Sequence, residues 1–132
     1  MQISLSALAI PLLMTVLAPK AFAASAVAFD TKKLVYEYSY GIRTEDEAKE
    51  RALKGCVRRS GRKCRVIISC AHGGYGAVYT GRLRDHSIVI VGATCGAADP
   101  YEANVGAEQS CNSQLRSEKC VGPKATWHDR AN

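Results

Sequence analysis

Residues 44–70 read TEDEAKERALKGCVRRSGRKCRVIISC, and the same pattern returns 55 residues further along the chain. The matched pairs are Thr44 with Asp99, Glu47 with Glu102, Ala48 with Ala103, Ala52 with Ala107, Cys56 with Cys111 and, after one inserted residue, Cys64 with Cys120. Self-similarity at a fixed offset indicates duplication of a structural unit. Each copy predicts a capped helix followed by a turn that carries paired cysteines.

The start of each predicted helix carries a capping signal. Thr44 and Glu47 form a capping box, in which each side chain bonds the other residue's backbone amide. Asp99 plays the same part in the second copy, with Pro100 at the favoured first position. In the first helix the alanines and Cys56 recur at helical spacing, so they share one face. Because alanine is small, we expect this face to lie close against a sheet.

Strand-like stretches flank both helices. They span residues 25–30, 34–40 and 63–70 in the first copy and residues 75–80, 87–93 and 119–127 in the second. The predicted order is therefore ββαβ twice. We expect an α+β fold: a single small disulfide-stabilised domain of two similar ββαβ halves, about 24–70 and 71–132. Gly122-Pro123 predicts that the last strand lies at a sheet edge.

Three tyrosines alternate along the second predicted strand, at Tyr36, Tyr38 and Tyr40. A period of two places them on one face of the sheet. We expect this face to be buried against the helix; the alternative is a platform on which a ligand stacks.

The first 23 residues have the pattern of a secretory signal peptide. Residues 5–17 form an apolar run that is shorter than the roughly 20 residues a spanning helix needs, and Ala21-Phe22-Ala23 is a small-x-small cleavage site. We expect cleavage before Ala24 and export to the periplasm or the extracellular space. The alternative is a retained anchor.

All six cysteines follow Ala24. An even number in an exported chain favours three disulfides. The alternative, a zinc site, fits less well because no pair has the short spacing of a zinc knuckle. The duplication predicts Cys56–Cys64 and Cys111–Cys120 as equivalent bridges, which leaves Cys70 to pair with Cys95.

The charge of the chain is positive and unevenly distributed. The net charge is +6, and between Arg51 and Arg84 there are nine Arg or Lys and no acidic residue. Such a field attracts anionic partners. The alternative is a solvated face that only favours solubility. The candidate binding residues are Arg58, Arg59, Arg62, Lys63, Arg65, Arg82 and Arg84.

Catalysis has little support in the sequence. His72, His86 and His128 all fall in predicted turns or in the tail, and the chain has no nucleophile elbow, phosphate-binding loop or HExxH motif. We therefore expect a non-catalytic binding module without metal or cofactor. Its partner would be an acidic protein, an anionic envelope polymer or a membrane surface; nucleic acid fits the exported compartment poorly. The alternatives are a small secreted enzyme and a structural or stress-related envelope protein with no specific ligand.

The two halves also carry a recognisable combination of motifs. Small-apolar strands (AVAF at 26–29, GAVY at 76–79) precede helices with the pattern Ala-x3-Ala-x3-Cys (AKERALKGC at 48–56, ANVGAEQSC at 103–111). Over nearly all of the chain after residue 23, this combination resembles a bacterial secreted family catalogued as domain of unknown function four-one-eight-nine. The resemblance implies export and transfers no catalytic residue.

Overall fold

The computed structural model describes residues 23–30, 32, 35–83, 88–116 and 118–130. The elements in chain order are β1 (Ala24–Asp30), β2 (Val35–Ile42), α1 (Glu45–Ser60), β3 (Arg65–Cys70), β4 (Gly74–Arg82), β5 (Val89–Ala97), α2 (Pro100–Asn112) and β6 (Val121–Asp129). This order confirms the predicted ββαβ repeat and the α+β class.

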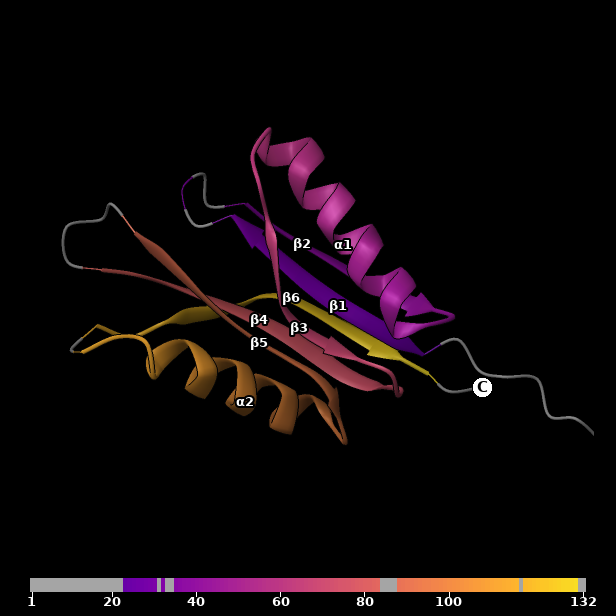
Figure 1. The fold of residues 1–132 in the computed structure, drawn as a ribbon. Helices are drawn as coiled ribbons and strands as arrows, with labels where there is room; N and C mark the ends of the chain where they lie inside the picture. The colour runs from indigo at the N-terminus through magenta and orange to yellow at the C-terminus, as the bar shows by residue number, and fades with distance from the viewer. Residues whose placement is uncertain (1–22, 31, 33–34, 84–87, 117, 131–132) are drawn as a thin grey trace, which may run out of the picture.

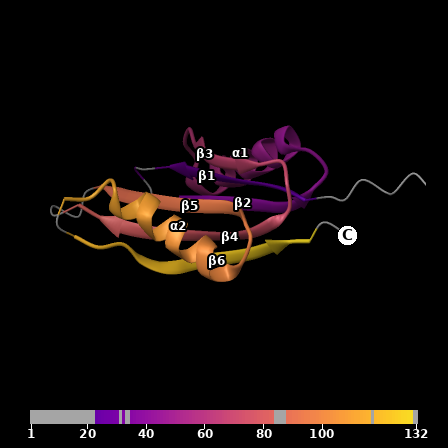
Figure 2. The ribbon, with the colours of Figure 1, turned by 90° about the horizontal axis from the view of Figure 1, so that it is seen from below.

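The two halves form separate antiparallel sheets that are stacked on each other. The strand order is β2-β1-β3 in the first sheet and β5-β4-β6 in the second, so β6 is an edge strand as predicted. Figure 1 shows α1 on the outer face of the first sheet and α2 on the outer face of the second. Figure 2 shows the same layers from below, with α2 nearest the viewer. The fold therefore has four layers, helix, sheet, sheet and helix.

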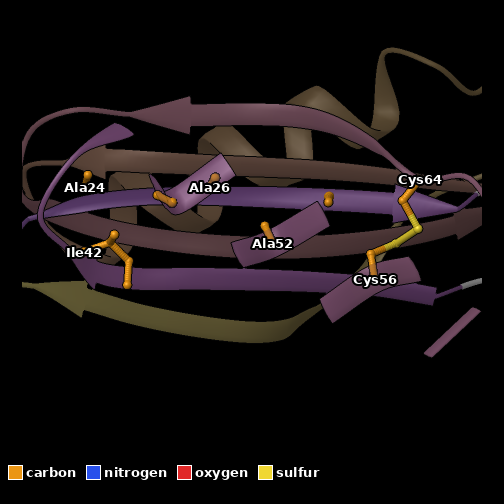
Figure 3. Close-up of a cluster of buried hydrophobic side chains, with 8 residues drawn as sticks. Ala24, Ala26, Ile42, Ala52, Cys56 and Cys64 are labelled. Carbon is orange, nitrogen blue, oxygen red and sulfur yellow. A yellow bond between two sulfur atoms is a disulfide. The ribbon is translucent and has the colours of Figure 1, made fainter. Parts of the chain in front are cut away.

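Helix α1 packs closely on the first sheet because small residues meet small residues. Ala48 and Ala52 are fully buried against the alanines of β1, Ala24, Ala26 and Ala28. Figure 3 shows this layer, with the Cys56–Cys64 bridge at one end. The predicted cap is present at Thr44, whose hydroxyl accepts a hydrogen bond from the Glu47 amide at 3.2 Å, whereas the Glu47 carboxylate pairs with Arg51 at 2.7 Å.

Helix α2 approaches the second sheet in the same way. Ala103 and Ala107 are buried, and the Asp99 carboxylate accepts a hydrogen bond from the Glu102 amide at 2.8 Å. The closest approach is at Gly92 in β5, where a Cβ atom would lie 2.3 Å from the Ala107 carbonyl oxygen. Only glycine leaves room for the helix backbone at this point.

Large apolar side chains from both halves lie between the two sheets. This inter-sheet core contains Val27, Phe29, Val78, Val89, Val91 and Trp127, together with smaller residues. Tyr38 stacks on Trp127 with ring centroids 5.2 Å apart. The inter-sheet core joins the two halves.

The tyrosine face of β2 packs differently from our prediction. Tyr36 and Tyr38 lie against the inter-sheet core, whereas Val35, on the opposite face, packs against α1. The prediction that these tyrosines pack against the helix is therefore wrong. The physical reason is space, because the alanine layer under α1 is too thin to accept a tyrosine ring. Tyr40, at the end of the row, is 52% exposed.

All three predicted disulfides are present, and no cysteine is free. Cys56–Cys64 and Cys111–Cys120 each tie the end of a helix to the segment that follows it. Cys70–Cys95 differs because it joins β3 of the first sheet to β5 of the second. It is the covalent link between the halves in addition to the chain itself.

Replacing both Cys70 and Cys95 with alanine is expected to lower the free energy of unfolding by about 3.5 kcal/mol, the loop-closure value for a bridge of this span. Urea denaturation of the oxidised double variant measures the change. A loss below about 1 kcal/mol would show that the inter-sheet core alone holds the halves together.

Gly92→Ala is expected to lower the free energy of unfolding by at least about 2 kcal/mol, because its Cβ would overlap the backbone of α2. Gly61→Ala is the matched control. Gly61 has a φ of 67°, and a Cβ added there would meet no atom within 4 Å, so this change costs only the left-handed conformation, about 1 kcal/mol. Equal losses in thermal or urea unfolding would contradict close packing at Gly92.

Candidate functional site

The duplication brings equivalent segments of both halves to one end of the molecule. Helix α1 ends at the top of Figure 1 and α2 at its lower left, and β1 and β4 run toward the same end. The cavities agree, because Tyr36 of β2 lines one cavity with Arg82 of β4, and Phe29 of β1 lines another with Val89 of β5. We call this region the basic end. It comprises the described residues Arg58, Arg59, Arg62, Lys63, Arg65, Arg82, Lys119 and Lys124.

Six of the seven candidate binding residues lie at the basic end, and all six are exposed. Arg58 and Arg59 belong to the last turn of α1, where positive charge complements the helix dipole, and are not in the loop itself. Arg62 and Lys63 form the connection to β3. The seventh candidate, Arg84, lies outside the described residues.

Arg59 is already engaged within the protein. Its guanidinium forms an ion pair with Glu37 at 2.9 Å and donates a hydrogen bond to the Tyr36 carbonyl oxygen at 2.9 Å. The absence of acidic residues between positions 51 and 84 therefore does not leave Arg59 unpaired, because β2 supplies the carboxylate. Arg59 holds the end of α1 to β2 and is a poor candidate for binding a partner.

The other cations of the basic end have no such partner in the described part of the chain. The ion pairs of α1 involve Lys49, Arg51 and Lys54, which lie earlier in the helix. Within residues 23–130, apart from the undescribed positions, no ion pair involves Arg58, Arg62, Lys63, Arg65, Arg82, Lys119 or Lys124. These side chains can therefore meet an external anion without first breaking an ion pair to another described residue.

A cavity of about 470 Å³ opens at the basic end between the two sheets. Its lining includes Tyr36, Arg82, Val89, Lys119, Val121 and Lys124. A second cavity of about 550 Å³ shares Val89 and extends past Phe29 to Arg65. The basic end thus has an apolar interior where the inter-sheet core reaches the surface.

Tyr36 lines the cavity of about 470 Å³ and contacts one of the lysines of the basic end. Its hydroxyl donates a hydrogen bond to the Lys124 carbonyl oxygen at 3.4 Å, which links β2 to β6 across the two sheets. Burial raises the pKa of this phenol above its ordinary value, and the nearby Tyr38 adds to the increase. Tyr36 therefore stays a neutral hydrogen-bond donor over the physiological pH range.

Sequence reasoning missed Lys119 and Lys124, because both lie outside the basic run between positions 51 and 84. For Lys119 a signal was available: it precedes Cys120 as Lys63 precedes Cys64, so the duplication itself puts the two lysines in equivalent places. No such correspondence points to Lys124, which reaches the cavity through the course of β6.

The residues with catalytic potential are dispersed. His72 is exposed, His128 stacks on Tyr75 with ring centroids 3.9 Å apart, and His86 lies outside the described residues. Among the described residues, no three His, Cys, Asp or Glu side chains lie close enough together to hold a metal ion. The buried carboxylate of Asp129 accepts a hydrogen bond from the Gly41 amide, and burial raises its pKa.

The duplicated sequence also matches a known protein family. The model of a family described as "Domain of unknown function (DUF4189)" matches residues 24–123. The chain belongs to this family. This confirms the resemblance carried by the duplicated helix pattern. Searches of curated proteins and of solved structures found no match.

The DUF4189 match begins at the first residue of β1 and ends within β6. It therefore includes both helices, all three disulfides and every cation of the basic end except Lys124, which lies one residue beyond it. In the described part of this DUF4189 chain, neither helix is long and apolar enough to cross a membrane.

Proposed function

We propose that this protein is an exported, non-catalytic binding module that engages an anionic partner through its basic end. The partner is an acidic protein, an anionic envelope polymer or a membrane surface. The observation that carries the proposal is the gathering of exposed cations from separate elements at one end, where Arg59 alone has an ion-pair partner among the described residues.

The distribution of acids strengthens this proposal. Glu45, Asp46 and Glu47 lie in the first turn of α1, and Glu102 lies in the first turn of α2. Both helices begin at the end opposite the basic end (Figure 1). The acids of these first turns therefore lie away from the basic end. The positive field there can attract an approaching anion and raise its association rate.

The scaffold behind the basic end is suited to binding. The Cys56–Cys64 bridge joins the last turns of α1 to the segment before β3, so it constrains both Arg58 in the helix and Arg62 and Lys63 in the loop that follows. A pre-ordered loop loses less conformational entropy when a partner binds. Hydrolysis or transfer chemistry would need a nucleophile beside a base, and the dispersed histidines offer no such arrangement among the described residues.

Export is supported by three features. Residues 1–23 have the signal-peptide pattern, β1 starts at Ala24 where cleavage is expected, and the six cysteines form three disulfides, which persist in oxidising compartments.

Intact mass spectrometry of the exported protein is expected to give the mass of residues 24–132 less six hydrogen atoms, with no cysteine alkylated under non-reducing conditions. Protein isolated from the cytoplasm serves as the control for the unprocessed mass. A secreted form that retains Lys20 would contradict cleavage before Ala24.

The triple variant Arg58→Gln, Arg62→Gln, Lys63→Gln tests the basic end. Since these side chains are exposed and have no ion-pair partner among the described residues, the fold should tolerate their loss. Partner capture from the native envelope should fall at least about tenfold, and capture by the unchanged protein should weaken steeply with salt. Arg59 is kept because its ion pair with Glu37 is structural.

The matched control is Lys49→Gln, Arg51→Gln, Arg130→Gln, which removes the same charge elsewhere on the protein. It should capture the partner nearly as well as the unchanged protein. If both triple variants lost partner capture equally, the loss would reflect the lower net charge and not the three cations of the basic end. Undiminished capture by the first variant, with matched circular dichroism, would reject its three cations as the binding surface. Substrate turnover in any fraction would favour the enzyme alternative.

A further inference from the structure

The cavity of about 470 Å³ at the basic end combines two chemistries that a simple electrostatic surface would not need. Arg82, Lys119 and Lys124 supply three cations, whereas Val89, Val121 and the ring of Tyr36 supply apolar surface. We propose that this cavity binds an amphipathic anion, namely a single phosphate or carboxylate group joined to one hydrocarbon chain.

The cations converge from different parts of the second half. Arg82 ends β4, Lys119 lies in the connection from α2, and Lys124 lies in β6. Like charges around one cavity repel each other, and no acidic side chain of the described residues pairs with them. A bound anion relieves this repulsion and forms charge-assisted hydrogen bonds with the guanidinium and the ammonium groups. This accounts for the charged head of the ligand.

The apolar part of the lining accounts for the hydrocarbon chain of the ligand. Val121 is 62% exposed although it lies beside the mouth of a cavity, and Val89, only 6% exposed, continues the wall into the inter-sheet core. An inorganic anion would leave Val121 in water, and a neutral hydrocarbon would leave the cations uncompensated. Only a ligand with both parts satisfies the whole lining.

The size of the cavity favours a ligand with one hydrocarbon chain. A volume of about 470 Å³ falls in the lower half of the usual range for small-molecule sites, roughly 300–1,000 Å³. It suits a single chain of moderate length better than the two long chains of a membrane phospholipid. The hydrogen bond of 3.4 Å from the Tyr36 hydroxyl to the Lys124 carbonyl oxygen and the stacking of Tyr38 on Trp127 both join β2 to β6 on this side of the sheets.

This inference rests on the proposed function in that the ligand is anionic, but it uses different residues. The variant that tests envelope capture changes Arg58, Arg62 and Lys63, and none of these lines the cavity. Loss of envelope capture and loss of amphiphile binding can therefore be measured separately.

Decyl phosphate is the probe, with decanol as the uncharged chain and inorganic phosphate as the free head group. Isothermal titration on the exported, oxidised protein, below the micelle concentration, should show saturable binding of decyl phosphate at least tenfold tighter than of either control. In two-dimensional NMR the methyl signals of Val89 and Val121 and the ring signals of Tyr36 should shift during the titration. Equal affinity for decanol or for inorganic phosphate overturns the proposal.

Variants then assign the site. Lys119→Gln and Lys124→Gln should each weaken decyl phosphate binding about fivefold or more, and Val121→Ser should weaken decyl phosphate but not inorganic phosphate. The double control Lys49→Gln, Lys54→Gln removes two cations of α1 and should bind normally. The triple variant Arg58→Gln, Arg62→Gln, Lys63→Gln should also bind decyl phosphate normally, even where it has lost envelope capture. Unchanged binding by the folded Lys119→Gln, Lys124→Gln double variant overturns the proposal.

A last arm distinguishes the source of the ligand. Vesicles of anionic phospholipid and vesicles of neutral phospholipid are sedimented with the protein, with decyl phosphate as competitor. Sedimentation with anionic vesicles alone, abolished by decyl phosphate, supports the cavity and identifies a membrane as the source. Decyl phosphate binding without sedimentation supports the cavity and identifies a released amphiphile. Sedimentation that decyl phosphate leaves unchanged, in a protein that does not bind decyl phosphate, overturns the proposal.

Discussion

Packing between the two sheets is the interaction on which the rest of the structure depends. Helix α1 lies so close to its sheet that mainly small side chains fit beneath it, whereas Tyr79 and Ile90 pack with the alanines beneath α2. Other large apolar residues meet in the inter-sheet core, where Phe29, Val78 and Trp127 come from both halves. The same core reaches the surface at the basic end, which is why the cations there surround apolar cavities and not a flat face.

Local signals predicted the fold well, because its elements are determined by short-range chemistry. The N-caps Thr44 and Asp99, the alanine faces and the duplicated cysteine spacing each specify structure within about ten residues. Alternation along β2 correctly separated its two faces, but it could not decide which face meets the helix. That choice depends on the thickness of the alanine layer and on the second sheet, neither of which a single strand encodes.

The candidate site was predictable only in part, for a related reason. The run of cations near Arg58 is visible in the sequence, whereas the ion pair of Arg59 with Glu37 joins residues far apart along the chain. Lys119 and Lys124 enter the cavity because the second sheet is stacked on the first, and no local pattern reports this stacking. The sequence therefore indicates the charged groups of the site more readily than the shape of its cavity.

The stacking of two similar halves has a consequence for the history of the chain. A single ββαβ unit would leave the inner face of its sheet exposed, so a protein with one such unit would need a second copy to cover it. In a homodimer of that kind every substitution occurs twice. Within one polypeptide this constraint is absent, and the two copies differ: Lys124 has Ile68 at the equivalent position after the cysteine. Each half can therefore change without the other.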